Sequence, residues 1–393
     1  MALTPIRRAA GNAYVLALAR GQRSIPYAPR AYVERLRDAR VRRIVRYAAR
    51  TVPFYRDALA KLGLDPREFR TAHDLARLPI VTKDDLRRAP EAFVSASRAG
   101  RLAIPFETSG STGSRVRILH DRRSLLANIA YGERERAVVA RLLGRESGYR
   151  EVRLGYAGGT LDKVYDFYRD HTWIPSRPQR LELSVTDPLA HNVEAINAYA
   201  PDILFGYGSY LHAIARAKAA GTIAMKPPKL VIYASEPLSL AARREIEDAL
   251  GAPVISRYTA VEAFKIAYLC EKRGGFHVHE DLAHLRIVGE DGRDVRDGET
   301  FGQPAANHAS ITSANVVCRL RAGSGADAWA RSVSSVSRST WASAFSTRST
   351  LRREPSGKRT HAIHRCFCSF HLTVGRCANA ASDVADPLLA TST

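Results

Sequence analysis

The sequence predicts an α/β protein with a layered, mostly parallel sheet, a helical N-terminus and a disordered C-terminal tail. Three observations support this fold class. From about residue 104, short apolar runs alternate with helical segments, as they do around parallel strands. Residues 1–50 place apolar side chains at helical spacing among arginines. After about residue 302, Ser, Thr, Arg and Ala dominate without a sustained helical or strand period, which is typical of disorder.

We therefore expect a helical region over residues 1–100, an α/β part over 101–302 and a low-complexity tail over 303–393. In the first region, Thr82 is the expected N-cap of a helix, with Asp84 and Asp85 in the first turn, where the helix dipole favours acids. The expected strands of the α/β part cover 116–119, 152–156, 181–185, 203–205, 230–234 and 254–258. The expected helices cover 124–143, capped by Asp121, then 187–199, 210–220 and 238–250, and a small hairpin begins at His284.

The chain is strongly basic. It carries 60 Lys and Arg against 39 Asp and Glu, a formal net charge of +21. Such an excess favours nucleic acid, an anionic membrane surface or anionic small substrates as partners. Many arginines between residues 35 and 50 are spaced by three and four, which places them on a solvated helix face. Because no RNP, zinc-finger or basic-zipper pattern accompanies them, we do not expect nucleic acid to be the main partner.

The sequence carries no recognisable signal peptide or membrane span, so we expect a cytoplasmic protein. The apolar stretch from Ala13 to Ala19 is too short to cross a bilayer, and Arg20 follows it. Cys270 alone among the five cysteines lies in the first 302 residues. That part of the chain therefore has no disulfide framework. With 45% apolar residues, the composition is that of a globular protein with a sizeable core.

A run of six small residues lies between two apolar-leaning segments. Its members, with the arginine that follows, are Thr108, Ser109, Gly110, Ser111, Thr112, Gly113 and Arg115. Backbone N–H groups beside glycine can approach a phosphate closely, hydroxyls add donors, and arginine binds phosphate with two nitrogens. The run therefore predicts a loop for a nucleotide triphosphate, and a flexible Ser/Gly connector is the alternative. It is not a P-loop, because no Gly-Lys pair follows Gly113.

The run resembles the signature loop T-S-G-S/T-T-G-x-P-K of the adenylate-forming ligases, with Ser114 and Arg115 where that family usually has Pro and Lys. Further segments resemble the branch that contains phenylacetate–CoA ligase and capsular-polysaccharide relatives. They are residues 52–59, 78–87, 201–211, 235–247 and 258–280. Their order and spacing extend the resemblance over about residues 45–302, and it implies the fold of the large N-terminal domain of these enzymes, with its nucleotide-binding part in 101–302.

The resemblance implies a two-step reaction with ATP, Mg²⁺ and coenzyme A. A carboxylate attacks the α-phosphorus of ATP to give acyl-AMP and pyrophosphate, and a thiol then takes the acyl group. In this scheme the 108–113 loop holds the β- and γ-phosphates, and Ser235, Glu236 and Pro237 line the nucleotide pocket. Tyr258 and Thr259 lie near the adenine and the α-phosphate, and Glu262 binds Mg²⁺. Thr259 and Glu262 are the expected catalytic residues, and an exposed acid at a helix start is the alternative for Glu262.

Other candidate residues carry weaker signals. Cys270 and His277 are spaced like zinc ligands, although a tetrahedral site needs more of them, and a buried Cys beside an exposed His is the alternative. His120 and His212 are expected to be structural or solvated. Three tyrosines could line a pocket for the acyl group or could pack in the core; they are Tyr131, Tyr156 and Tyr207.

The tail departs from the resemblance. The family continues with an Asp that binds the ribose and a small domain that supplies a lysine, and residues 303–393 match neither, with Lys358 in no recognisable context. The tail is typical of translation in another reading frame or of a divergent replacement. We therefore expect a protein that is inactive or nearly so, derived from a ligase.

The sequence thus leaves three functions open. The first is an acid–CoA ligase, on an aryl-acetate-like acid, whose partners are the acid, ATP and CoA; a homodimer is left open. The second is an inactive ligase-like protein whose basic surface binds an anionic polymer such as nucleic acid. The third is an acyl-activating protein of polysaccharide synthesis without a CoA step.

Overall fold

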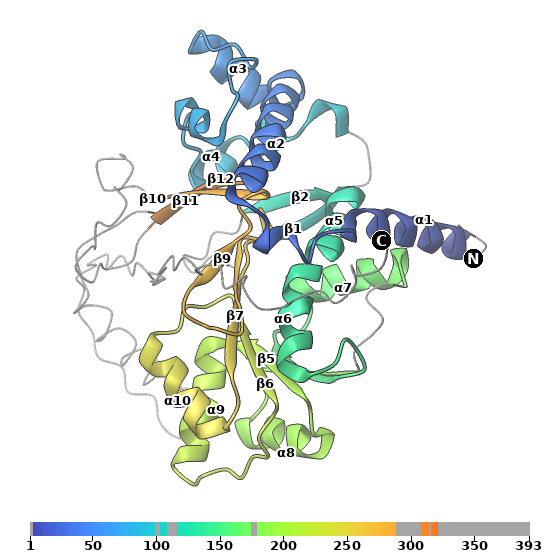
Figure 1. Cartoon of the computed structure of the whole chain (residues 1–393), viewed down its shortest axis with the longest axis vertical. Coiled ribbons are helices and arrows are strands. Elements are labelled where there is room, and N and C mark those ends of the chain that lie inside the picture. Colours follow the sequence, from blue (N-terminus) through green and yellow to red (C-terminus); the bar gives the residue numbers. More distant parts are fainter. Residues whose placement is uncertain are drawn as a thin grey trace, which may run out of the picture.

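The computed structural model describes residues 3–98, 103–107, 116–173, 179–287, 308–313 and 316–320 (Figure 1). The expected phosphate loop, with Arg115, lies outside these residues, and so does the chain from residue 321 onward. Within the described part, helices α2 to α4 lie at one end of the molecule and a mixed sheet with its helices at the other (Figure 1). The α/β fold class with a helical N-terminus is confirmed.

A largely parallel sheet forms the α/β part. Within the described residues its order is β4-β3-β5-β6-β7-β8-β9, and the first five strands of this order are parallel. The last two are short and antiparallel. The strands are β3 (Arg150–Gly155), β4 (Gln179–Ser184), β5 (Ile203–Tyr207), β6 (Leu230–Ala234), β7 (Val254–Tyr258), β8 (Ala267–Leu269) and β9 (Phe276–Val278).

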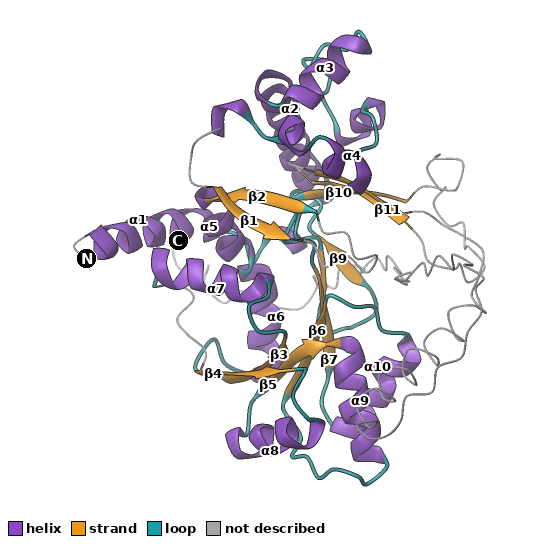
Figure 2. Ribbon diagram, turned by 180° about the vertical axis from the view of Figure 1, so that it is seen from behind, coloured by secondary structure: helices purple, strands orange, loops and turns teal. Residues whose placement is uncertain are grey.

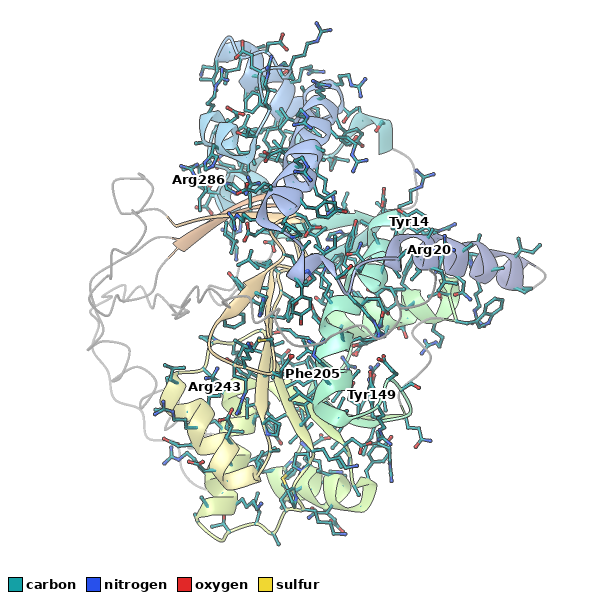
Figure 3. All side chains as sticks on the ribbon, in the orientation of Figure 1. Tyr14, Arg20, Tyr149, Phe205, Arg243 and Arg286 are labelled. Carbon is teal, nitrogen blue, oxygen red and sulfur yellow. The ribbon has the colours of Figure 1, made fainter. Side chains whose placement is uncertain are left out.

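Helices cover both faces of this sheet (Figure 2). On one face, Leu204 and Val231 pack with buried residues of α8 (Leu189–Tyr199), α9 (Gly208–Ala219) and α10 (Leu240–Leu250). On the other face, Ile203 and Phe205 pack with buried residues of α6 (Glu133–Leu143), and Tyr149 closes this cluster at the start of β3 (Figure 3). Because both faces are covered, the central strands are apolar at every position, which is why their sequences are continuous apolar runs.

A second core joins α1 (Leu3–Ala19), α5 (Arg122–Tyr131) and α7 (Thr160–His171) around Val15, Leu125 and Phe167. α1 and α7 approach each other so closely that a Cβ at Gly11 would lie 2.0 Å from the carbonyl oxygen of His171. α7 is absent from the sequence-based expectations. Its signal was present, because Val164, Phe167 and Tyr168 follow the three- and four-residue spacing of a buried helix face.

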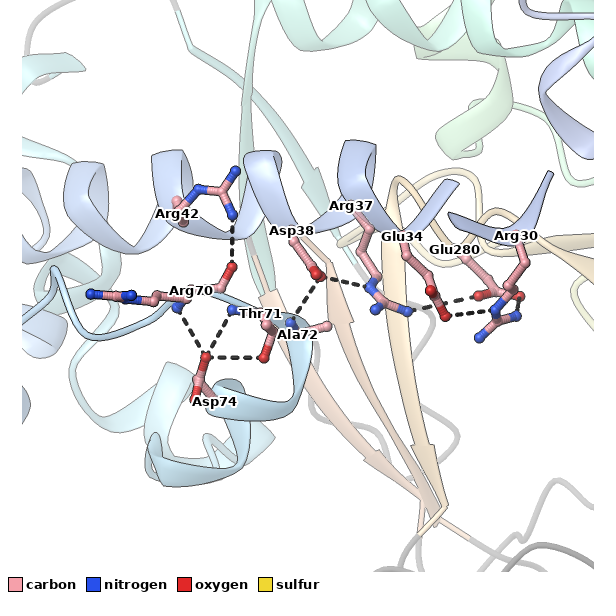
Figure 4. Close-up of polar contacts among 10 residues, drawn as sticks. All are labelled: Arg30, Glu34, Arg37, Asp38, Arg42, Arg70, Thr71, Ala72, Asp74 and Glu280. Atoms are coloured by element: carbon pink, nitrogen blue, oxygen red, sulfur yellow. Dashed lines mark hydrogen bonds and ion pairs between the residues drawn. The ribbon is translucent and has the colours of Figure 1, made fainter. Parts of the chain in front are cut away.

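The N-terminal helices α2 (Arg30–Thr51), α3 (Pro53–Lys61) and α4 (Lys83–Arg88) form a third cluster with the 3₁₀ helix η2 (Ala72–Arg77). The expected cap of α4 is confirmed, since Asp85 N donates to Thr82 Oγ1 at 3.2 Å. Polar contacts attach α2 to its neighbours: Arg30 and Arg37 pair with Glu280, and Asp38 accepts from the backbone N–H of Ala72 (Figure 4). The remaining 3₁₀ helices are η1 (Ile25–Tyr27), η3 (Pro90–Phe93) and η4 (Ala96–Arg98).

Further features differ from the expectations. The helix expected over 124–143 is two helices, α5 and α6, which meet at Gly132, although Asp121 caps the first of them as expected through Ser124 N at 2.7 Å. Strands β11 (His308–Ser313) and β12 (Val316–Leu320) extend β10 (Ala283–Ile287) in an antiparallel sheet, where no regular structure was expected. The edge of a strand can form backbone hydrogen bonds with almost any sequence, so composition does not predict such pairing.

Candidate active site

The carboxyl ends of the parallel strands bring three predicted segments to one edge of the sheet. In the register of the sheet, Tyr207, Ala234 and Arg257 lie side by side at the ends of β5, β6 and β7. Ser235 directly follows β6, and Thr259 directly follows β7. The predicted segments that begin at Ser235 and at Tyr258 are therefore adjacent. In parallel α/β sheets this edge is where ligands bind.

The turn after β6 has a constrained backbone. Ser235 has a φ of +70°, in the left-handed region that residues other than glycine seldom adopt. Glu236 Oε2 then accepts a hydrogen bond of 2.9 Å from Ser209 N, at the first turn of α9, where the helix dipole favours a carboxylate. A Cβ at Gly208 would lie 2.8 Å from Leu238 Cγ, so glycine is needed for this turn to approach α9. Pro237, the next residue of this turn, is half-buried.

The turn after β7 carries Thr259, which is exposed, and Glu262, which is 7% exposed. The turn closes through Ile266 N, which donates to Tyr258 O at 3.2 Å. It is also held from outside, because His120 Nε2 lies 2.7 Å from Val261 O. A carbonyl only accepts, so Nε2 carries the proton and donates. Burial lowers the pKa of His120, which keeps its ring neutral in this structural role.

The ends of the expected phosphate loop lie close to this edge. The loop connects β1 (Ala103–Glu107) with β2 (Arg117–Asp121), which pair in antiparallel register up to Glu107 and Arg117. Thr160 Oγ1, at the start of α7 after β3, lies 3.5 Å from Glu107 O. His120 of β2 contacts the turn that carries Glu262. Glu107, the last residue of β1, therefore lies beside the start of α7, which follows β3.

Two tyrosines mark the point where the strand order reverses. β3 leads to β4 on one side, whereas its other neighbour β5 leads to β6 in the opposite direction, and the point between two such strands is the usual position of a ligand crevice. Tyr156 follows β3 and is 57% exposed, Tyr207 ends β5, and their ring centroids are 5.5 Å apart. Tyr131 lies elsewhere, under the guanidinium of Arg40, whose Cζ is 5.7 Å from the ring centroid.

The donor sets for the two expected metals differ. The Glu262 carboxylate forms no hydrogen bond or ion pair with another described residue, and a carboxylate oxygen suits Mg²⁺. Cys270 packs in the apolar cluster on one face of the sheet, and His277 stacks on Tyr268 with centroids 5.5 Å apart. Within the described ranges, no three His, Cys, Asp or Glu side chains gather in a metal-binding group, so this pair does not fit zinc there. His212 pairs with Glu245 at the surface, as expected.

Comparison with curated proteins finds relatives that include phenylacetate–coenzyme A ligases and the protein CapK. The chain is 26% identical over 282 residues to a phenylacetate–coenzyme A ligase of Thermus thermophilus, a match that covers 69% of this chain and 60% of that ligase. It is 23% identical over 233 residues to protein CapK of Staphylococcus aureus, covering 58% of this chain and 50% of CapK. No family model matches the chain.

Solved structures agree with these relatives. A 2-hydroxyisobutyryl-CoA ligase, in the postadenylation state, has a TM-score of 0.60 at 17% identity, covering 76% of this chain and 64% of that one. The chain resembles the adenylate-forming ligases in sequence and in fold. The resemblance expected from the motifs is thereby confirmed. The matches span less than two thirds of the length of these relatives.

Within this adenylate-forming ligase fold, the sequence-based list of site residues missed a group of buried charges beside the turn of Glu262. Glu135 Oε2 accepts from Lys265 Nζ at 2.8 Å and lies 3.3 Å from Arg257 Nε. Next to it, Arg134 donates to Asp281 at 2.6 and 2.8 Å. Nothing in the sequence marks these residues, because a Glu-Arg-Glu-Arg start is typical of a solvated helix.

No described helix is long and apolar enough to cross a membrane.

Proposed function

We propose that this chain carries the nucleotide-binding part of an ATP-dependent acid–CoA ligase that acts through an acyl-adenylate. The observation that supports it is the convergence of the turns after β6 and β7 and the ends of the β1–β2 hairpin at one edge of a parallel sheet. In the first step a carboxylate oxygen of the acid bonds to the α-phosphorus of ATP, and the bond to pyrophosphate breaks. In the second step a thiol sulfur bonds to the acyl carbon, and AMP leaves.

Each segment has a role in this proposal. The 108–113 loop holds the β- and γ-phosphates through backbone N–H groups and hydroxyls, and Arg115 adds a positive charge. Ser235, Glu236 and Pro237 form a wall of the adenine pocket, and Tyr258 and Thr259 face the adenine and the α-phosphate. Glu262 would hold Mg²⁺, which neutralises phosphate charge when bound.

The acid is proposed to be an aryl-acetate-like carboxylate. Tyr156 and Tyr207 support this assignment, because two aromatic rings near the reversal point of the sheet offer a flat apolar wall to an aryl group. A thioester with coenzyme A is the proposed product.

A binding experiment tests the proposal at Glu262. Isothermal titration of the full chain with ATP is run once with Mg²⁺ and once with EDTA. We expect Glu262→Gln to weaken binding of MgATP at least tenfold and to change binding of ATP in EDTA much less, because the lost charge acts on the metal. Glu194→Gln, an exposed change on α8, is the matched control and should bind as the unchanged chain does.

Two results of this titration would contradict the proposal. Equal loss of affinity with and without Mg²⁺ would remove Glu262 from the metal and leave it a structural role. Absence of any nucleotide binding by the unchanged chain would refute the proposed function. ATP–pyrophosphate exchange with a set of aryl-acetates then measures whether this chain performs the adenylation step.

One observation favours a second function, binding of a nucleic acid through its phosphates. Four exposed arginines lie along one face of α2, within about 80° of each other at 100° per residue; they are Arg35, Arg43, Arg46 and Arg50. In the described part of the chain none of the four forms an ion pair, whereas Arg30, Arg37 and Arg40 of the same helix do. Retention on DNA that falls with salt, and that is lost when these four become alanine, would support this function.

A further inference from the structure

Helix α6 begins with two buried charges. Arg134 and Glu135 are 3% and 4% exposed. A buried charge is stable only when it is paired and hydrogen-bonded. Both side chains find their partners far along the chain: Arg134 pairs with Asp281, and Glu135 pairs with residues on either side of the turn that carries Glu262.

One oxygen of Glu135 holds two cations. Its Oε2 accepts a hydrogen bond from Lys265 Nζ at 2.8 Å and lies 3.3 Å from Arg257 Nε. Arg257 directly precedes Tyr258, and Lys265 follows Glu262 by three residues. The two ends of the turn between β7 and β8 are therefore tied to the same atom of α6.

The middle of the turn is held by a different element. His120 of β2 donates to Val261 O at 2.7 Å, and its ring packs on Phe264 with centroids 4.2 Å apart. Phe264 has a φ of +56°, a left-handed conformation that is strained for an aromatic residue and persists only where the surroundings enforce it. The backbone of Glu262 thus depends on anchors at both ends and in the middle.

The groups around Glu135 leave it ionised. Burial by itself raises the pKa of this carboxyl, but Lys265, His279 and Arg257 outweigh burial and hold the pKa far below its ordinary value. His279 faces it as a neutral ring, since burial lowers the pKa of His279. Arg134 Nη1 lies 3.2 Å from His279 Nδ1, and because arginine only donates, the His279 proton is on Nε2, 3.6 Å from Glu135 Oε1.

We propose that Glu135 is a positioning residue for Glu262, acting through Lys265 and Arg257, which tie both ends of the turn after β7 to helix α6. The link to MgATP rests on the proposed function, whereas the effect on the turn does not. A carboxylate that holds Mg²⁺ must be fixed closely, because a small displacement removes it from the coordination distance. Glu135 supplies that fixation from helix α6, through its contacts with Lys265 and Arg257.

Four variants of the full chain test this inference: Glu135→Gln, Lys265→Met, the double variant, and Glu133→Gln as the matched control. Glu133 lies on the same turn of α6 but pairs with Arg23 and Arg136 at the surface. The readouts are the dissociation constants of ATP with Mg²⁺ and with EDTA, and amide hydrogen exchange of residues 258–266. Folding of each variant is checked by urea unfolding.

We expect Glu135→Gln to weaken MgATP at least tenfold more than ATP in EDTA, and to speed exchange of the Phe264 and Ile266 amides at least tenfold. Glu133→Gln should change neither. Glu135→Gln leaves the buried charges of Lys265 and Arg257 without their carboxylate. The double variant also removes the charge of Lys265, so it should unfold at a higher urea concentration than Glu135→Gln. It should still show weak MgATP binding and fast exchange, because the tie between Lys265 and α6 is absent.

The opposite results are equally defined. Unchanged exchange in folded Glu135→Gln would overturn the inference, and so would recovery of both stability and MgATP affinity in the double variant, which would mean a purely structural role. If the unchanged chain binds no nucleotide, the proposed function fails, and the exchange rates alone decide whether Glu135 positions the turn.

Discussion

Asp281 and Glu280 are adjacent acidic residues in very different surroundings. The Asp281 side chain is 1% exposed and accepts from Arg134 at 2.6 and 2.8 Å and from Arg40 at 2.9 Å. Glu280 is 35% exposed at its side chain and pairs at 2.9 Å with Arg30, which is 66% exposed, while Arg37 lies 3.9 Å away. Solvent and salt weaken the second set of contacts but not the first.

This contrast gives a prediction at the scale of single residues. Asp281→Asn should lower the free energy of unfolding by about 3–5 kcal/mol, because it leaves Arg134 buried without its counter-charge. Glu280→Gln should lower it by less than about 1 kcal/mol, since exposed pairs contribute little. Urea unfolding of both variants at pH 7 measures the difference, and equal losses would contradict the assigned burial of the Asp281 pair.

At this scale the sequence predicted some residues and missed others. Ser235, Tyr258 and Glu262 could be proposed because they lie at or after the ends of runs predicted to be strands, and because their motifs resemble a known family. Arg134 and Glu135 could not be found. Their partners Asp281, Lys265 and Arg257 lie more than 120 residues away, and alternating charges at a helix start look the same whether water or protein faces them.

At the scale of elements, helices α1 and α7 pack so closely that glycine is required at position 11. A Cβ at Gly11 would lie 2.0 Å from His171 O, a backbone atom that cannot rotate away. We expect Gly11→Ala to lower the free energy of unfolding by about 1–3 kcal/mol through the forced separation of the helices. Gly274→Ala is the control, because no atom lies within 4 Å of that position.

Thermal unfolding followed by circular dichroism measures both glycine variants. Gly11→Ala should unfold at a lower temperature than Gly274→Ala. A gain in stability at Gly11, which alanine would bring in an uncrowded helix, would show that α1 and α7 do not pack as described.

The elements themselves were predicted unevenly. β6 and β7 begin and end where expected. β6 is covered on both faces and forms an uninterrupted apolar run bounded by turns, whereas β7 is apolar at Val254, Ile255 and Tyr258 but carries Ser256 and Arg257. The helix expected over 124–143 breaks at Gly132 into two helices. The break was not predicted, because a single glycine inside a helical pattern is often tolerated without one. β8 and β9 were missed, since strands of three residues are too short to show a period.

The whole molecule should lose stability in two steps as the pH falls. Burial lowers the pKa of His120, His277 and His279 from the ordinary 6.5. Below pH 6.5 the unfolded chain therefore binds more protons than the folded chain, and the free energy of unfolding decreases as the pH falls. A second decline begins below pH 4.5, because the pKa of Glu135 in the folded protein lies far beneath the unfolded value of 4.5.

Urea unfolding at half-unit intervals from pH 8 to pH 3.5 checks this dependence. Each proton of difference changes the free energy of unfolding by about 1.4 kcal/mol per pH unit. His120→Phe should flatten the slope between pH 6.5 and 5, and Glu135→Gln should flatten it below pH 4.5. A slope of the opposite sign in either range would contradict the assigned direction of the pKa shifts.

The buried charges of α6 also constrain the order in which the chain folds. Arg40 and Arg134 both donate to Asp281, and Arg134 also donates to Gln22, so these contacts span up to 241 residues of sequence. During synthesis from the N-terminus, α1, α2 and α6 emerge long before Asp281 does. Contacts of such high sequence separation form late and slow the folding rate. We therefore expect nascent chains that stop before residue 281 to keep α6 hydrated and easily cleaved by protease, and chains that extend past Ala283 to become resistant.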